Sequence, residues 1–107
     1  MTTENKADDG AWNFRALPAG FRKISGMKRQ TRADAPPGMH WVFSDGLAAV
    51  SVFIDPVGDA PAETGLFKMG ALNVYKRLLG EHLIVVMGDV PSVTLKRLGD
   101  GIEGRRK

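Results

Sequence analysis

A chain of 107 residues and 11.6 kDa fits a single compact domain and is too short for a two-domain enzyme with a cleft between its lobes. Its 43% hydrophobic and 25% charged residues are typical of a globular protein, and the absence of cysteine excludes disulfide scaffolds, thiolate metal sites and cysteine nucleophiles. The net charge is +3, but residues 11–32 alone hold six basic residues and no acid, which favours an anionic partner.

The N-terminal residues 1–11 are polar and acidic, unlike a signal peptide, and they resemble a linker. We therefore expect a disordered tail there, in a chain that is a fragment of a longer protein whose signal peptide lies outside it. Residues 12–17 alternate apolar and polar side chains and predict a short strand, followed by a turn at 18–20. Residues 21–31 predict a longer strand, and the breakers at 33–38 predict a loop.

A hairpin is the strongest local pattern. Two β-rich runs within residues 39–54 flank Asp45-Gly46, the dipeptide that a two-residue type I′ turn prefers. That turn places Ser44 opposite Leu47 and divides the side chains of the hairpin between two faces. The predicted core face is uniformly apolar: Met39, Trp41, Phe43, Ala48, Val50, Val52 and Ile54. The other face is mixed: His40, Val42, Ser44, Leu47, Ala49, Ser51 and Phe53.

The next segments predict a second hairpin. Residues 55–65 are acidic and rich in proline and glycine, which predicts a long loop. Residues 66–77 and 83–87 predict strands that are joined around 79–81. Residues 72–77 could also form a helix by propensity, but the short connection into the next strand favours an antiparallel hairpin.

Near the C-terminus the period of the apolar residues changes from that of a strand to that of a helix. One stripe of an amphipathic helix is formed by Pro91, Leu95, Leu98 and Ile102. Asp89 is the expected cap of this helix. The sequence thus predicts an α+β fold, an antiparallel sheet of about six strands with one C-terminal amphipathic helix packed on one face. The expected domain covers residues 12–102, and 103–107 form a basic, frayed tail.

The residues offer little catalytic or metal-binding chemistry. His40 and His82 are the only histidines, and neither stands at metal-ligand spacing with another ligand. The turn explains the run from Ser44 to Gly46, which is therefore no candidate nucleophile. The glycines fit neither a P-loop nor a dinucleotide-binding fingerprint. We expect a non-enzymatic protein without catalytic residues, metal or cofactor.

Two groups of residues are candidates for binding a partner. The first is a basic stretch: Arg22, Lys28, Arg29 and Arg32. The second lies on the mixed face of the hairpin: Val42, Leu47 and Phe53. For the basic stretch we favour an ordinary solvated strand face over a binding role, because charged strand faces are common. Burial beneath the N-terminal strand is the alternative for the mixed face, and we favour it because Trp12, Leu17 and Phe21 also need burial.

Several short segments together carry a family resemblance. They are Trp12, Leu17-Pro18-Ala19-Gly20-Phe21, Phe43-Ser44-Asp45-Gly46-Leu47 with the strand that follows, Lys68-Met69-Gly70-Ala71-Leu72-Asn73-Val74-Tyr75 and Val86-Met87-Gly88-Asp89-Val90-Pro91. In this order they resemble the C-terminal domain of the MucB/RseB family over residues 12–102. The matching motifs look like turns and core, so the resemblance assigns no partner contact to any residue.

The resemblance implies a non-enzymatic negative regulator of the envelope-stress sigma factor, located in the periplasm. Such proteins bind the periplasmic part of a membrane anti-sigma factor and protect it from proteolysis. Their full-length members carry a larger N-terminal domain similar to lipoprotein carriers, so the anti-sigma factor and that domain are the expected partners. One alternative is an envelope module that binds anionic lipid or lipopolysaccharide through the basic stretch. A basic nucleic-acid-binding domain ranks third, and we expect no nucleic acid, because the nearby aromatic residues are needed for the core.

Overall fold

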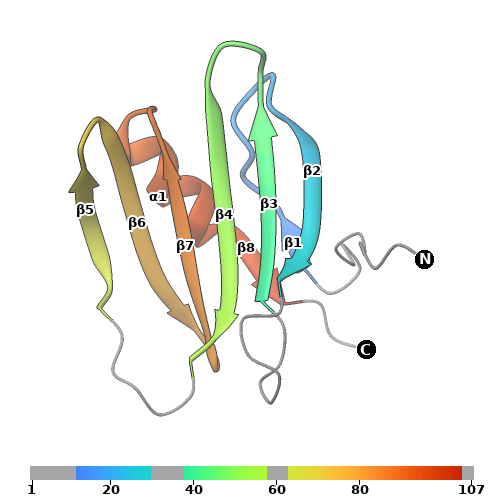
Figure 1. Cartoon of the computed structure of the whole chain (residues 1–107), viewed down its shortest axis with the longest axis vertical. Coiled ribbons are helices and arrows are strands. Elements are labelled where there is room, and N and C mark those ends of the chain that lie inside the picture. Colours follow the sequence, from blue (N-terminus) through green and yellow to red (C-terminus); the bar gives the residue numbers. More distant parts are fainter. Residues whose placement is uncertain (1–11, 30–37, 58–62, 105–107) are drawn as a thin grey trace.

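The structure, a computed structural model, describes residues 12–29, 38–57 and 63–104 (Figure 1). These residues form eight strands and one helix. In chain order they are β1 (Trp12–Phe14), β2 (Arg22–Arg29), β3 (Gly38–Ser44), β4 (Ala49–Pro56), β5 (Gly65–Met69), β6 (Leu72–Leu79), β7 (His82–Gly88), α1 (Ser92–Asp100) and β8 (Ile102–Gly104). The predicted tail at 1–11 lies outside the described residues.

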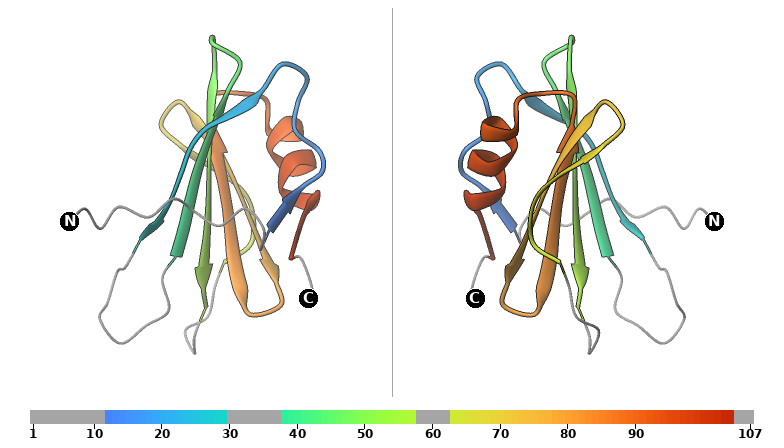
Figure 2. Two further views of the ribbon diagram at one scale, coloured as in Figure 1. Left: turned by 90° about the vertical axis from the view of Figure 1, so that its right-hand side faces the viewer. Right: turned by 90° about the vertical axis from the view of Figure 1, so that its left-hand side faces the viewer.

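Six of the strands form one antiparallel sheet in the order β2-β3-β4-β7-β6-β5. The helix α1 packs on one face of this sheet, against β6 and β7 (Figure 2). On the same side, β1 pairs with β8 in a separate two-stranded sheet. The predicted α+β fold with one helix on one face of an antiparallel sheet is confirmed.

The strands of the main sheet differ in part from those that the sequence predicts. The strand predicted at 12–17 is shorter and pairs with β8 instead of joining the main sheet. The strand predicted at 66–77 is two strands, because a tight turn at Gly70-Ala71 lets Met69 pair with Leu72. Gly70 adopts a φ of +63°, which a residue without a Cβ tolerates easily.

The core lies between the main sheet and α1. Every second residue of the central strands points into it, as the period of two in a strand requires. On β3 and β4 the buried residues are those of the predicted core face: Met39, Trp41, Phe43, Val50, Val52 and Ile54. The other strands and the helix add Tyr75, Ile84, Val86, Leu95, Leu98 and Ile102. The hairpin pattern therefore identified the core face correctly, except that Ala48 lies in the loop.

The β3–β4 connection is wider than predicted. Ser44 pairs with Ala49, so the loop has four residues and the expected two-residue turn is wrong. Side-chain hydrogen bonds close this wider loop, because the N–H groups of Leu47 and Ala48 both donate to the Asp45 carboxylate at 2.9 Å. The bonds from Ala48 and Leu47 also lower the pKa of Asp45. Since the register shifts by two residues along β4, the two faces stay as predicted.

The helix α1 starts at Ser92 and has Pro91 as its N-cap residue. The Pro91 carbonyl accepts hydrogen bonds from the N–H groups of Thr94 and Leu95 at 2.9 and 3.3 Å. The expected cap, Asp89, lies two residues before this position, and no side chain caps the helix. The predicted cap is therefore wrong, whereas Leu95 and the rest of the expected stripe within the helix are buried.

Residues 102–104 form a strand after α1, where the sequence predicts a frayed tail from 103, and residues 105–107 lie outside the described residues. The Arg15 N–H donates to the Gly101 carbonyl at 3.2 Å, and Ile102 then pairs with Phe14 in the small sheet. Glu103 also belongs to β8, and its carboxylate lies 3.1 Å from the guanidinium of Arg15. The buried Ile102 therefore belongs to a strand and not to the helix. β8 extends two residues past the expected domain end at 102.

A polar cluster holds the C-terminal end of α1. The Tyr75 hydroxyl donates to the Asp100 carboxylate at 2.5 Å, and the Lys96 ammonium donates to it at 2.8 Å. Burial alone would raise the pKa of Asp100, but the hydrogen bonds from Lys96 and Tyr75 bring that pKa below its usual value. The ionised carboxylate therefore stabilises the fold at neutral pH, and this stabilisation is lost as the pH falls through the lowered pKa.

The close packing of α1 on β6 depends on Gly99. A Cβ at this position would lie 2.7 and 2.9 Å from two ring carbons of Tyr75, whose hydroxyl is held by Asp100. We expect Gly99→Ala to lower the free energy of unfolding by about 1–3 kcal/mol, although alanine alone favours a helix by about 1 kcal/mol. Urea denaturation measures the change, with Val93→Ala at an exposed position of α1 as the control. A Gly99→Ala protein as stable as the wild type would contradict this packing.

Candidate partner-binding surface

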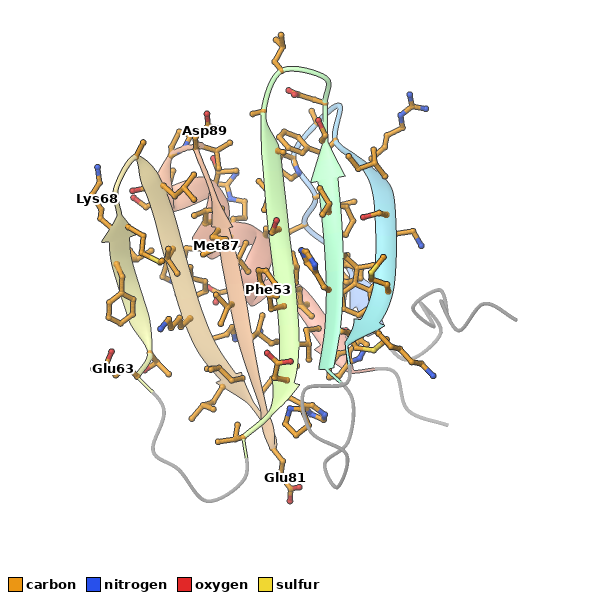
Figure 3. The ribbon with its side chains drawn as sticks, viewed as in Figure 1. Phe53, Glu63, Lys68, Glu81, Met87 and Asp89 are labelled. Atoms are coloured by element: carbon orange, nitrogen blue, oxygen red, sulfur yellow. The ribbon has the colours of Figure 1, made fainter. Side chains whose placement is uncertain are left out.

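The face of the main sheet opposite α1, called the open face below, is covered by no helix or strand of the described residues (Figure 2). Strand register places every second side chain of the sheet on it. Its apolar residues are Met27, Val42, Phe53, Phe67, Met69, Leu72, Val74, Leu78, Leu83, Val85 and Met87. Phe53 and Met87 lie in the middle of this face in Figure 3. The sheet therefore has two apolar faces, and α1 covers only one of them.

Side chains on the open face contact one another across the strands. One row of register neighbours crosses the sheet from β2 to β6: Met27, His40, Phe53, Val85 and Lys76. The rings of His40 and Phe53 are stacked, with 4.2 Å between their centroids. The Lys76 ammonium lies 5.2 Å from the centroid of the Phe67 ring, within the range of a cation–π interaction. These contacts pack the face into a continuous surface.

Two of the predicted binding residues, Val42 and Phe53, lie half-buried on the open face. The favoured interpretation, that the N-terminal strand covers them, is wrong. β1 lies on the α1 side, where the Phe14 ring packs against the rings of Trp41 and Phe43. The distances between the ring centroids are 5.0 Å to Trp41 and 5.1 Å to Phe43. Pairing with β8 explains this position, because it directs Phe14 toward the core.

The third predicted residue of the mixed face, Leu47, does not join Val42 and Phe53. It lies at the tip of the β3–β4 loop, where 95% of its surface is exposed. The pair that contains Phe53 lies four register positions from the Ser44–Ala49 pair, a distance of about 13 Å along the strands. Leu47 is thus an isolated apolar residue and not a part of the open face.

The predicted basic residues occupy an edge strand and are divided between both faces of the sheet. Arg22 pairs with Ser44, which places it on the open-face side. Lys28 pairs with Met39 and belongs to the α1 side. A register shift at Ile24 separates Lys28 from Arg22, because one extra residue reverses the alternation that would otherwise put these two positions on the same face of β2. Arg22 and Lys28 are exposed, as a solvated strand requires, but they do not share one face, and Arg32 lies outside the described residues.

The two histidines lie on opposite faces of the sheet. His40 stacks on Phe53, whereas His82 packs edge-on against Trp12 with 5.0 Å between the ring centroids. No group of three or more potential metal ligands occurs within the described residues. In the same part of the chain, no helix has the length and hydropathy of a membrane span.

The α1 side carries two shallow hollows. One, of about 310 Å³, lies between the segment after β1 and the helix, and it is lined by Ala16, Leu17, Pro18, Ala19, Thr94 and Arg97. The other, of about 290 Å³, lies along the helix and is lined by Val93, Lys96, Arg97 and Asp100. Apolar and charged residues line both hollows.

Sequence reasoning missed the part of the open face that β7, β6 and β5 contribute. Residues 83–87 are apolar at every position, so their pattern indicates a buried strand without separating two faces. The separation appears only through register, because Phe53 pairs with Val85 and Ser51 with Met87. A strand order placing β7 beside β4 was the missing information.

Comparison with known proteins identifies the family. A model of the MucB/RseB C-terminal domain matches residues 6–103. The chain belongs to the MucB/RseB C-terminal domain family. This match and the motifs between Trp12 and Pro91 agree, so the resemblance seen in the sequence is confirmed.

Characterised relatives of this MucB/RseB domain are regulators of sigma factors. The chain is 34% identical over 96 residues to the sigma factor AlgU regulatory protein MucB of Pseudomonas aeruginosa. It is 26% identical over 100 residues to the sigma-E factor regulatory protein RseB of Haemophilus influenzae. These matches cover 82% and 94% of this chain but only 29% and 31% of the relatives. The chain therefore corresponds to less than a third of each relative.

Solved structures of MucB share the fold. A crystal structure of MucB in complex with MucA(peri) matches 91% of the chain with a TM-score of 0.75 and 27% identity, and the match covers 37% of that MucB chain. The complex of Pseudomonas aeruginosa MucA and MucB gives a TM-score of 0.74 at 26% identity over 91% of the chain and 36% of the solved chain. The MucB/RseB domain described here is thus similar to a part of MucB in both complexes.

Proposed function

We propose that this domain is a protein-interaction module of a negative regulator of the envelope-stress sigma factor. It binds the periplasmic part of a membrane anti-sigma factor in the periplasm and protects that part from proteolysis. The observation that carries the proposal is the similarity, over 91% of the chain, to MucB in complex with MucA(peri). The names of the characterised relatives as regulators of AlgU and sigma-E support the same role.

The module acts by binding and not by catalysis. The sequence holds no cysteine, and its two histidines face opposite sides of the sheet. The open face supplies what a binding module needs, an apolar surface that can be buried by a partner. Val42 and Phe53 are proposed contacts on this surface.

The basic residues of the N-terminal half guide the partner toward the domain. Arg22 and Lys28 are exposed on an edge strand, and Arg29 and Arg32 follow them in the sequence. Charges at the rim of an interface mainly raise the rate of association, and salt screens them over about 8 Å at physiological ionic strength. In this proposal Leu47 is a peripheral contact at the loop tip.

The relatives are longer than this chain, which leads to a second proposed partner. The match covers only 29% and 31% of these relatives. From the family resemblance we further propose that the domain works together with a larger N-terminal domain of the same protein, similar to lipoprotein carriers. An anionic lipid surface is the alternative target of the basic residues. We expect no binding to nucleic acid.

Charge reversal on β2 tests the proposal through kinetics. In the double variant Arg22→Glu/Lys28→Glu, association with the cognate anti-sigma periplasmic part is expected to slow by about 3- to 10-fold at low salt and by much less at high salt. Surface-based kinetics measure the rates, and calorimetry measures the affinity. Lys68→Glu on β5, at the opposite edge of the sheet, is the matched control and should leave the rate nearly unchanged.

The same experiment includes anionic vesicles and duplex DNA at matched ionic strength. Saturable binding to vesicles, with none to the anti-sigma periplasmic part, would replace the proposal by a lipid-binding module. Saturable binding to duplex DNA alone would replace it by a nucleic-acid-binding domain. Equal slowing by the β2 variant and the β5 control would contradict the steering role of the basic strand.

A further inference from the structure

The open face is too apolar for an ordinary solvated sheet face. An antiparallel sheet with one solvated face normally places polar residues on that face. Here Met27, Met69 and Leu78 are 38%, 60% and 46% exposed, and Val85 and Met87 lie half-buried between them. A contiguous apolar surface of this kind marks a place where another element packs.

We propose that the open face binds an amphipathic helix whose apolar stripe is bordered by acidic residues. This inference rests on the proposed function, since the helix belongs to the periplasmic part of the anti-sigma factor. It extends the contacts proposed at Val42 and Phe53 to the whole open face, and it adds the chemistry of the segment that is recognised.

A helix suits a sheet face better than an extended segment does. An extended segment laid flat on apolar side chains leaves its own N–H and C=O groups without partners, and this costs free energy. A helix satisfies those groups internally and presents an apolar stripe. The opposite face of this sheet shows the same solution, because α1 packs on β6 and β7 through Leu95 and Leu98.

The edges of the sheet are poor places for an added strand. β2 carries the bulge at Ile24 and basic residues on both sides of it, two features that hinder pairing with a further strand. β5, at the other edge, has only five residues from Gly65 to Met69. A partner segment therefore finds its largest continuous apolar surface on the face of the sheet and not at its edges.

The composition of the face suits a protein partner. Three of the five methionines of the chain, Met27, Met69 and Met87, lie on it. Methionine side chains are flexible and polarisable, so they adapt to the shape of a bound helix. Phe53 and Phe67 add aromatic surface, which is enriched at protein interfaces.

The charges on the face favour an acidic segment. Arg22 lies on the β2 side and Lys76 lies on β6 near the other edge, and both belong to the open-face side. The acid on this side is Asp55, near one end of the sheet. Its carboxylate lies over Gly38, in the space that a Cβ at this position would occupy. Six strands span about 24 Å, which a helix of about 16 residues covers.

Methionine methyl groups provide a direct test on the full chain. The protein is labelled with [¹³C-methyl]methionine and titrated with the cognate anti-sigma periplasmic part, while calorimetry on the same samples measures complex formation. We expect the signals of Met27, Met69 and Met87 to shift or broaden. The signal of Met39, which is 9% exposed on the α1 side, is the internal control and should stay in place.

The two proposals fail in different ways in this experiment. If calorimetry detects no heat of binding and no methionine methyl signal changes, the proposed function is overturned and the interface with it. A complex detected by calorimetry in which the open-face methionines stay in place would leave the function intact and overturn the interface. In the labelled partner, a bound segment without helical ¹³Cα shifts would overturn the proposed helix.

Variants test the same surface independently. Met27→Glu and Met87→Glu are expected to weaken the affinity about tenfold or more, because each places a carboxylate under an acidic, apolar helix. Val93→Glu adds the same charge at a 63% exposed position of α1 and should change the affinity less than twofold. Far-UV circular dichroism of each variant verifies the fold. Equal affinity of the open-face variants and the α1 control would overturn the interface.

Discussion

Replacement of Trp41 by alanine is expected to lower the free energy of unfolding by about 3–5 kcal/mol. Trp41 is fully buried on β3, pairs with Val52 on β4 and contacts the Phe14 ring edge-on at a centroid distance of 5.0 Å. The substitution therefore opens a cavity in the main core and removes the side chain on which Phe14 of the small sheet packs. For a domain of this size, such a loss approaches the whole stability.

Urea denaturation followed by far-UV circular dichroism measures this effect. Leu47→Ala, at the 95% exposed tip of the hairpin, is the control and should change the stability by less than about 0.5 kcal/mol. In a Trp12→Phe background, the fluorescence of Trp41 should be blue-shifted and poorly quenched by acrylamide. The precision of such melts is about 1 kcal/mol. A Trp41→Ala protein whose free energy of unfolding equals that of the wild type within this precision would contradict the central position of this residue.

The faces of the hairpin could be predicted because they depend on a local rule. Side chains alternate along a strand, so the apolar series through Trp41 and the one through Val52 share one face for any loop with an even number of residues. The loop itself could not be predicted from Asp45-Gly46 alone. Its width depends on the Asp45 carboxylate, which accepts two N–H groups and stabilises a four-residue connection over the two-residue turn.

The pairing of β1 with β8 has no local signal in the sequence. Each strand has three residues, and they come from opposite ends of the described chain. Phe14 and Ile102 are apolar and need burial, but this need does not say which other strand each will pair with. The same uncertainty about strand neighbours led to the wrong prediction that the N-terminal strand covers Val42 and Phe53.

The candidate site was predictable only in part for related reasons. Alternation put Val42 and Phe53 on one face, which register confirms, but their exposure depends on where β1 packs. The basic stretch was visible as a run of charges, whereas the shift at Ile24 that puts Arg22 and Lys28 on opposite faces was not. One inserted residue reverses every position that follows it, and such a bulge leaves no trace in composition.

Arg77 joins three elements of the fold, which explains why the end of α1 stays attached to the sheet. From β6 its guanidinium donates to the Gly99 carbonyl at 2.8 Å and to the Ile102 carbonyl at 3.3 Å, and it lies 3.9 Å from the Asp100 carboxylate. Carbonyls at the end of a helix lack partners within the helix, so a charged donor from the sheet stabilises them. The contact to Ile102 extends this support to β8.

Arg77→Ala is therefore expected to lower the free energy of unfolding by about 2–3 kcal/mol, because two half-buried carbonyls lose a charged donor. Arg77→Lys should recover only part of this loss, since a single ammonium cannot reproduce the forked geometry of the guanidinium. Arg97→Ala removes the same charge from an exposed position of α1 and is the matched control. Urea melts give the stabilities, and hydrogen exchange should show faster exchange at Arg15, whose N–H bonds to Gly101 beside the released helix end. Equal losses for the Arg77 and Arg97 variants would mean that charge alone, and not this connection between helix and strands, sets the contribution of Arg77.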